Sequence, residues 1–241
     1  MSRPASRLIQ GMNKLELLNR EIVTCRLCPR LVEYRAQVAG TKRRAFLDWE
    51  YWGKPVPGFG DPAAQLLLIG LAPGAHGANR TGRMFTGDRS GDFLYRALYE
   101  AGFASQPQSV SAGDGMKLSN AYISAAVRCA PPENKPEVQE FKNCRPYLET
   151  EISLLPEVRV VVVLGKAAFD TYLAVLQSEG KIERRSAFAF GHNREHRTGP
   201  HQPVLICSYH PSQQNTSTGK LTVPMFRAVF ELAKKHLNAV R

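Results

Sequence analysis

The sequence is poor in acidic residues and in cysteine, and it lacks any long hydrophobic run. Its 241 residues include 21 Asp and Glu against 32 Lys and Arg, a formal charge of +11, and only 5 cysteines. No apolar stretch reaches the roughly 18 residues that a membrane-spanning helix needs. The basic N-terminus has no continuous apolar segment of the kind found in secretory signals. We therefore expect a cytoplasmic protein without a membrane segment, in which disulfide bonds are disfavoured.

Two common nucleotide-binding patterns are also missing. The segment GANRTGRM has Gly77 and Gly82 at the spacing of a phosphate-binding loop, but Arg83 and Met84 stand where that loop has Lys and then Ser or Thr. The fingerprint G-x-G-x-x-G of dinucleotide-binding folds does not occur. These absences argue against an NTPase and against a nucleotide cofactor.

The excess of positive charge favours a polyanionic partner, because Lys and Arg that neutralise phosphates release condensed counterions. A basic composition also occurs in proteins without such a partner. Charge alone therefore leaves both possibilities open.

Four short apolar runs alternate with helical patterns, which predicts an α/β fold. The runs cover residues 65–71, 121–127, 158–164 and 203–209. The helical patterns cover residues 92–101, 136–155, 166–176 and 223–237. The run VRVVVVLG is apolar on both faces, as in a strand between two helix layers. We expect a three-layer αβα domain with a central four-stranded parallel sheet. No repeat or linker divides residues 1–241, and the basic segment 178–202 is expected to form a hairpin or an exposed loop.

Polar, turn-rich segments follow three of these strands. They are LIGLAPGAHGANRTGRMFTGD (residues 68–88), RCAPPENKP and SYHPSQQNTSTGK. Ligands of such sheets bind beyond the carboxyl ends of the strands, so the three segments should meet at one edge. Gly70, Gly74 and Gly77 permit close approach of the backbone, and Phe85 either stacks on a planar ring or anchors the loop. His210 follows the fourth strand, where an imidazole is able to donate to a developing anion.

Four of the five cysteines are spaced like metal ligands. CRLCP places Cys25 and Cys28 within one turn, and Cys129 and Cys144 follow much later in the chain. Thiolates in this arrangement bind zinc or an iron–sulfur cluster. A site shared by all four would tie the N-terminal segment to the body of the domain. Cys207 lies in the apolar pattern of the fourth strand and is expected to be buried.

Together these segments resemble the uracil-DNA glycosylase superfamily. GLAPGAHGANRTGRMFTGD, VRCAPPENKP, HPSQQNTSTG and the four cysteines are similar to family 5, the iron–sulfur type with broad specificity, from about Cys25 to the C-terminal helix. The resemblance implies a DNA repair enzyme that flips uracil out of DNA, stabilises the leaving base anion and leaves an abasic site. DNA containing uracil or another deaminated base is the expected partner, and the chain is expected to be a monomer. The alternative is a catalytically weak protein of the same fold that binds DNA or damaged bases.

The resemblance also implies roles for individual residues. The four matching ligands of a [4Fe–4S] cluster, with zinc as the alternative, are Cys25, Cys28, Cys129 and Cys144. The cluster would clamp residues 1–60 to the body or act as a redox centre. Relatives have a carboxylate or amide at or next to the position of Ala72 and an asparagine on the second strand, where this sequence has Ser124. Asp88 is therefore the candidate for positioning water, and His210 the candidate for stabilising the leaving base. Without an amide that reads uracil, hypoxanthine or xanthine should also be accepted.

The other candidates line the predicted pocket or face DNA. The substrate-binding set is Gly70, Ala72, Gly74, His76, Asn79, Phe85, Ser124, Asn134 and His210. The DNA-binding set is Arg80, Arg83, Ser212, Gln213, Asn215, Thr218 and Lys220. The two arginines either hold phosphates or brace the loop through carboxylates. The segment after His210 is expected to probe the minor groove and to fill the space left by the flipped base.

Overall fold

The computed structural model of the protein describes residues 13–239. In this range a sheet has the strand order β1–β3–β2–β4–β6–β5. Its central strands are parallel and comprise β2 (Leu66–Gly70), β3 (Ala121–Ala125), β4 (Val160–Leu164) and β6 (Val204–Ser208). Each lies within one of the four predicted runs, so the parallel core of the sheet is confirmed. Residues 1–12 of the expected N-terminal segment 1–60, and residues 240–241, lie outside the described range.

Two short edge strands make the sheet mixed, which corrects the expectation of four parallel strands alone. β1 (Phe59–Gly60) pairs antiparallel with β3, and β5 (Glu195–Arg197) pairs antiparallel with β6. Strands this short carry too little alternation to be recognised in a sequence. β5 lies inside the basic segment 178–202, where a hairpin or exposed loop was expected. The fold is α/β with three layers around a six-stranded mixed sheet.

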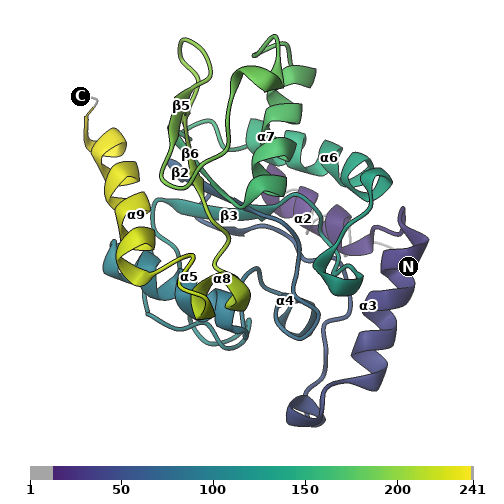
Figure 1. Ribbon diagram of the computed structural model, residues 1–241. Helices are drawn as coiled ribbons and strands as arrows, with labels where there is room; N and C mark the ends of the chain where they lie inside the picture. Colours follow the sequence, from purple (N-terminus) through teal and green to yellow (C-terminus); the bar gives the residue numbers. More distant parts are fainter. Residues whose placement is uncertain (1–12, 240–241) are drawn as a thin grey trace.

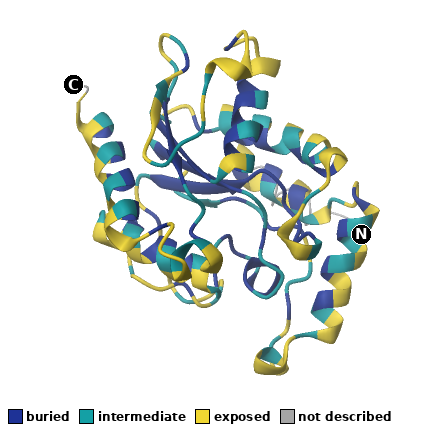
Figure 2. Ribbon diagram, viewed as in Figure 1, coloured by how far each residue is buried: buried dark blue, intermediate teal, exposed yellow. Residues whose placement is uncertain are grey.

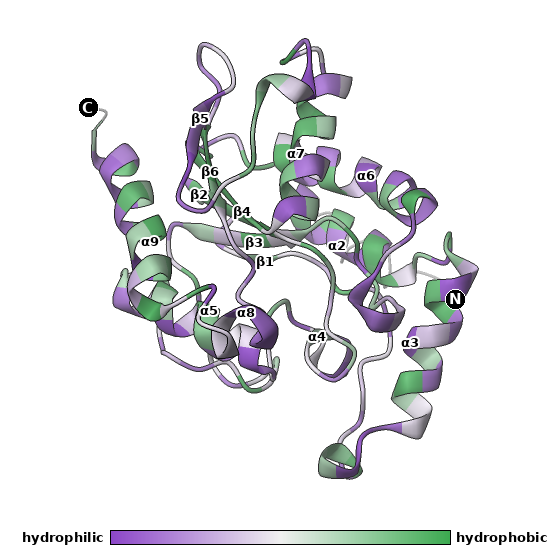
Figure 3. Cartoon of the chain, in the orientation of Figure 1, coloured by the Kyte–Doolittle hydropathy of each residue, from purple (hydrophilic) through white to green (hydrophobic). Residues whose placement is uncertain are grey.

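Burial on both faces explains the composition of the central strands. Every residue of β2, β3, β4 and β6 is buried, and Figure 3 shows these strands in hydrophobic colours. Leu66 and Leu68 pack with α5 (Arg89–Glu100) and α9 (Val223–Asn238). Leu67 and Ile69 pack with α6 (Val138–Ser153) and α7 (Lys166–Ser178) on the opposite face. The two helix layers therefore exclude water from both sides of the sheet, as Figure 2 shows.

The N-terminal helices lie outside this sandwich. α2 (Lys14–Thr24) packs on α6, and α3 (Pro29–Thr41) packs on the short α4 (Ala78–Thr81). η1 (Arg44–Phe46) follows α3 at the lower end of Figure 1. The other short helices are η2 (Pro132–Asn134), η3 (Arg185–Ala187) and α8 (Gln213–Ser217). Among residues 13–239, every helix is too short or too polar to cross a bilayer.

Candidate active site and cysteine-lined pocket

The loop after β2 and the turn after β6 meet at the carboxyl edge of the sheet. The ring centroids of Phe85 and His210 are 5.9 Å apart with an interplanar angle of 31°. A Cβ atom at Gly70 would lie 2.8 Å from two carbons of the Phe85 ring, so only glycine lets the ring rest on the strand. Phe85 itself has φ 52°, a left-handed conformation that a bulky residue rarely adopts. The fold therefore forces this partly exposed ring into place beside His210, and we call this region the mouth.

The carboxylate of Asp88 lies against the glycine backbone of the same loop. Its Oδ1 accepts from the backbone N–H of Gly91 at 2.9 Å and thereby caps α5. Its Oδ2 lies where a side chain at Gly74 or Gly77 would stand, and a Cβ at Gly74 would come within 2.8 Å of it. Burial raises the pKa of Asp88, and the N–H of Gly91 offsets part of this effect. The carboxylate of Asp88 therefore caps α5 with one oxygen and turns its other oxygen toward the loop.

The imidazole of His210 is neutral at pH 7. Burial lowers its pKa to about 4, because desolvation disfavours the charged ring. The side-chain amide of Asn215 donates to the carbonyl of His210 at 2.9 Å. Gly165 has φ 98°, and a Cβ there would lie 3.3 Å from the Cβ of His210. A neutral imidazole held in this way offers an N–H donor to an anion at the mouth.

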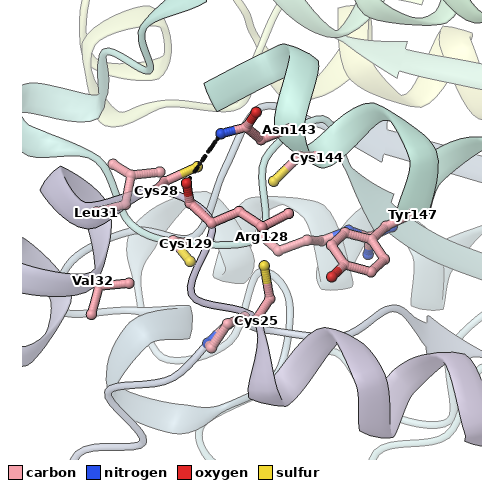
Figure 4. Close-up of a pocket in the computed structure, with 11 residues that line it drawn as sticks. Cys25, Cys28, Leu31, Val32, Arg128, Cys129, Asn143, Cys144 and Tyr147 are labelled. Carbon is pink, nitrogen blue, oxygen red and sulfur yellow. Dashed lines mark hydrogen bonds between the residues drawn. The ribbon is translucent and has the colours of Figure 1, made fainter. Parts of the chain in front are cut away.

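A second site gathers four of the five cysteines around one pocket (Figure 4). The sulfur atoms of Cys25, Cys28, Cys129 and Cys144 point toward a common space of about 320 Å³ that is partly open to solvent. Cys25 ends α2 and Cys28 precedes α3, whereas Cys129 follows β3 and Cys144 lies in α6. No three His, Cys, Asp or Glu side chains within residues 13–239 are arranged to hold a single metal ion.

The surroundings of this pocket are apolar, with two N–H donors that reach sulfur. Arg35 Nη1 donates to Cys129 Sγ at 3.4 Å, and Asn143 Nδ2 donates to Cys28 Sγ at 3.3 Å. Burial raises the pKa of Cys129 to about 12 and that of Cys144 to about 11. Thiols so placed keep their protons unless a metal takes over the charge. Donors of this kind, aimed at sulfur, are typical of the surroundings of iron–sulfur clusters.

Residues 57–234 match the family model described as the uracil DNA glycosylase superfamily. The chain belongs to this superfamily. It is 52% identical over 219 residues to the Type-5 uracil-DNA glycosylase of Thermus thermophilus, which covers 89% of this chain and 94% of the relative. Proteins of the same name from Mycobacterium leprae and Mycobacterium bovis are 49% and 48% identical, over 93% and 95% of this chain and 96% and 84% of theirs. The resemblance predicted from the loops and cysteines is confirmed.

In this member of the superfamily, Ser124 does not face the mouth. Its hydroxyl donates to Glu151 of α6 and accepts from Arg128 Nη2 at 3.0 Å. Arg128 and Glu151 form a salt bridge of 2.6 Å, and none of the three residues is more than 1% exposed. The predicted contact between Ser124 and a base does not fit, because the hydroxyl is used in this buried network.

The two arginines of the loop are bound within the protein. Arg80 is 3% exposed, and its guanidinium donates to the carbonyls of His76 and Gly87 at 2.8 and 2.7 Å. Arg83 is 5% exposed and forms a salt bridge of 2.6 Å with Asp114. Of the two roles left open by the sequence, bracing the loop fits this geometry, and phosphate binding does not.

Four other substrate-binding candidates make their contacts elsewhere. Ala72 packs against the cysteine pocket, and Asn79 Nδ2 lies 3.4 Å from the carbonyls of Arg35 and Ala75. The Tyr51 hydroxyl lies 3.1 Å from His76 Nδ1. Asn134 is exposed on η2. Ala72 and Asn79 connect the loop to the region of α3, and His76 connects it to the segment after η1, a function that the sequence did not reveal.

The segment after His210 is exposed beside the mouth. Ser212 caps α8, and the hydroxyl of Thr218 donates to the carbonyl of Gln214 at 2.7 Å. Gln213 and Lys220 are exposed, and the ammonium of Lys220 lies 5.2 Å from the centre of the Tyr209 ring. Asn215 holds the backbone of His210 rather than facing outward, which the sequence did not predict.

His192 is a residue of the mouth that sequence reasoning missed. Its ring stacks on Tyr209 with centroids 5.0 Å apart and an angle of 26°. Nδ1 accepts from the N–H of Tyr209 at 3.2 Å, and Nε2 donates to the carbonyl of Met225 at 3.2 Å. Because Nδ1 accepts, the ring is held as the neutral tautomer that carries its proton on Nε2. A single histidine in a basic loop carries no sequence signal for this role.

Proposed function

We propose that the protein hydrolyses the N-glycosidic bond of uracil in DNA, the activity named for its relatives. The observation that carries the proposal is the pair of Phe85 and a neutral His210 at 5.9 Å, with the carboxylate of Asp88 against the glycines of the loop that carries Phe85. A ring, a donor and an acid are the groups that the removal of a planar base requires.

The base must leave the duplex before these groups reach it, at a cost of about a few kcal/mol. The ring of Phe85 is then available to stack on the extruded base, because Gly70 lets it lie flat against β2. As the bond breaks, negative charge grows on the base, and the N–H of His210 stabilises it. A neutral donor suits this step, since it gains strength as the charge develops.

Positive charge develops on the sugar at the same time, and water must attack from its other face. Oδ2 of Asp88 is turned toward the backbone of Gly74 and Gly77, where it is able to orient a water molecule. Its raised pKa supports a role in proton transfer. We assign Asp88 to water positioning and His210 to the leaving base.

The same geometry supports acceptance of hypoxanthine or xanthine. The hydroxyl of Ser124 is bound to Glu151, and Asn79 is fully buried, with its Nδ2 3.4 Å from two backbone carbonyls. Neither side chain is therefore available to select uracil by its edge. Stacking on Phe85 and hydrogen-bond donation by His210 do not distinguish uracil from hypoxanthine or xanthine, because each of these bases has a planar ring and an oxygen acceptor.

We propose that the cysteine pocket holds a [4Fe–4S] cluster rather than a single zinc ion. Four thiols line one pocket, and N–H donors reach the sulfur atoms of Cys129 and Cys28, as hydrogen bonds reach the sulfurs of such clusters. Cys25 and Cys28 come from the N-terminal helices, and Cys129 and Cys144 come from the body of the fold. When bound, the cluster supplies iron–thiolate bonds that link these segments, which supports the clamp over a redox role.

The test is a panel of duplex oligonucleotides that carry uracil, hypoxanthine, xanthine or thymine opposite each normal base. We expect alkali-labile sites at uracil, hypoxanthine and xanthine, and intact strands at thymine. Protein that retains its iron but leaves uracil strands unbroken after alkali would overturn the proposal. Tight binding of uracil duplex without cleavage would instead identify the catalytically weak alternative.

A further inference from the structure

Residues 42–54 form a segment that projects from the end of α3 beside α4, at the lower end of Figure 1. We call this segment the arm. Its sequence KRRAFLDWEYWGK contains four basic residues against two acidic ones, together with four aromatic rings. None of the roles assigned above uses its charges.

Aromatic contacts fix the arm to the loop of the mouth. The guanidinium carbon of Arg80 lies 3.9 Å from the ring centroid of Phe46 and 4.0 Å from that of Trp49. The backbone N–H of Trp52 donates to the carbonyl of Arg80 at 2.9 Å, and that of Gly53 donates to the carbonyl of Asn79 at 3.0 Å. The arm therefore keeps a fixed position relative to α4.

A second set of contacts brings positive charge to the same loop. The Tyr51 hydroxyl lies 3.1 Å from His76 Nδ1 and accepts from the backbone N–H of Arg43 at 3.4 Å. The positive charges of Arg43 and Arg80, added to burial, lower the pKa of His76. Arg43 is thus close to His76, in the loop that follows β2.

The arginines of the arm are available for binding. Arg43 and Arg44 are exposed, and neither takes part in a salt bridge of residues 13–239. Beside them Leu47 is 57% exposed. Two unused cations next to a large exposed apolar side chain, on a segment fixed to the mouth, are suited to a nucleic-acid backbone.

We propose that the arm is a second DNA-binding element, in which Arg43 and Arg44 each bind a phosphate. This inference rests on the proposed function. The segment of α8 reaches the mouth through His210, whereas the arm reaches it through α4 (Figure 1). Phosphate contacts position a protein on the duplex, and flipping rotates the nucleotide about its backbone, so contacts on both sides of the nucleotide would hold that backbone in place. The arm supplies the contact that α8 does not make.

The chain offers a matched control. RRAF at residues 43–46 and RRSAF at residues 184–188 both place two exposed arginines at the start of a 3₁₀ turn. The second turn, η3, packs on α7 and not on the loop of the mouth. The double variants Arg43→Ala/Arg44→Ala and Arg184→Ala/Arg185→Ala remove the same charge from exposed turns.

The experiment measures the affinity of both double variants for a duplex without uracil over a range of NaCl concentrations. Each lost phosphate contact lowers the slope of log K against log [salt] by about 0.9, so the arm variant should lose about 2. The η3 variant should lose less than about 0.5.

Equal slopes for the two variants, or an unchanged slope for the arm variant, would overturn the inference. Because the probe carries no uracil, the result does not depend on cleavage. If the wild type fails to cleave uracil DNA but the arm variant has the lower slope, only the proposed function is refuted. If the wild type cleaves uracil DNA but the arm variant keeps the wild-type slope, only the role of the arm is refuted.

Discussion

The cysteine pocket and the mouth are built in different ways. The pocket joins four separate parts of the chain, and its walls are apolar. The mouth is built from loops that directly follow β2 and β6, so the sheet already holds its parts together. Replacing a cysteine of the pocket should release whole segments of the chain from one another. Replacing a side chain of the mouth should leave the strands of the sheet paired. We therefore expect the pocket to control stability and the mouth to control rate.

Burial acts on both regions by the same physical rule, with different consequences. Desolvation disfavours charged groups, so it raises the pKa of Cys129 to about 12 and lowers that of His210 to about 4. The neutral imidazole is the form that donates to a base anion. The neutral thiol is not the form that binds metal, so the proposed cluster would have to displace the protons of the buried thiols.

The largest expected effect tests the pocket. Cys144→Ser should abolish the visible absorbance and the iron content of the purified protein and lower its melting temperature by about 10 °C or more. The matched control is Cys207→Ala, a buried cysteine of β6 outside the pocket, which should retain the iron. A Cys144→Ser protein with full iron content and an unchanged melting temperature would contradict the clamp.

The outcome of the sequence predictions follows the same division. Strands buried on both faces were found because their composition shows it, and the cysteines were found because their spacing is rare. Ser124 was placed wrongly, because a sequence does not say which face of a buried strand meets α6. The sequence left the role of Arg83 open between binding phosphate and bracing the loop, because its carboxylate partner, Asp114, lies in a loop far away in the chain. Side-chain partners that are far apart in the chain are what a single sequence hides.

At the mouth, His210→Ala should reduce the rate of uracil removal by about 10²- to 10³-fold, the usual effect of losing a donor to developing charge. The affinity for uracil-free duplex and the melting temperature should change little, because the ring serves neither. Single-turnover kinetics and DNA titration check both statements. A parallel loss of stability and rate would show that His210 supports the fold instead.

Asp88 has a structural role as the cap of α5 and a proposed catalytic role in positioning water, and two variants distinguish these roles. Asp88→Asn keeps a good helix cap, whereas Asp88→Ala removes it and should cost about 1 kcal/mol of stability. Both variants lose the carboxylate, and both should react about 100-fold more slowly. Activity close to wild type in Asp88→Asn would reduce Asp88 to a cap.

A smaller effect is expected from the residue that positions the turn. His192→Phe keeps the stacking on Tyr209 but removes the acceptor for its N–H and the donor to Met225. A net hydrogen bond contributes about 0.5–1.5 kcal/mol, so the rate at saturating DNA should fall by about tenfold or less. The KM for uracil DNA should stay near that of the wild type, since His192 does not contact the base. A change confined to KM would contradict the positioning role.

The last expected effect is the contribution of His210 to the dependence of stability on pH. The pKa of His210 is lowered to about 4 in the folded protein, against about 6.5 for an unperturbed histidine. The unfolded chain therefore binds more protons than the folded one between these values, so stability falls as pH decreases from about 6.5 towards 4. Melting temperatures at pH 7 and pH 5 should differ more in the wild type than in His210→Ala. NMR of the imidazole should show a neutral His210 at pH 5. A His210 ring that is already charged at pH 6 would show that burial does not keep this donor neutral, which would contradict the role given to burial at the mouth.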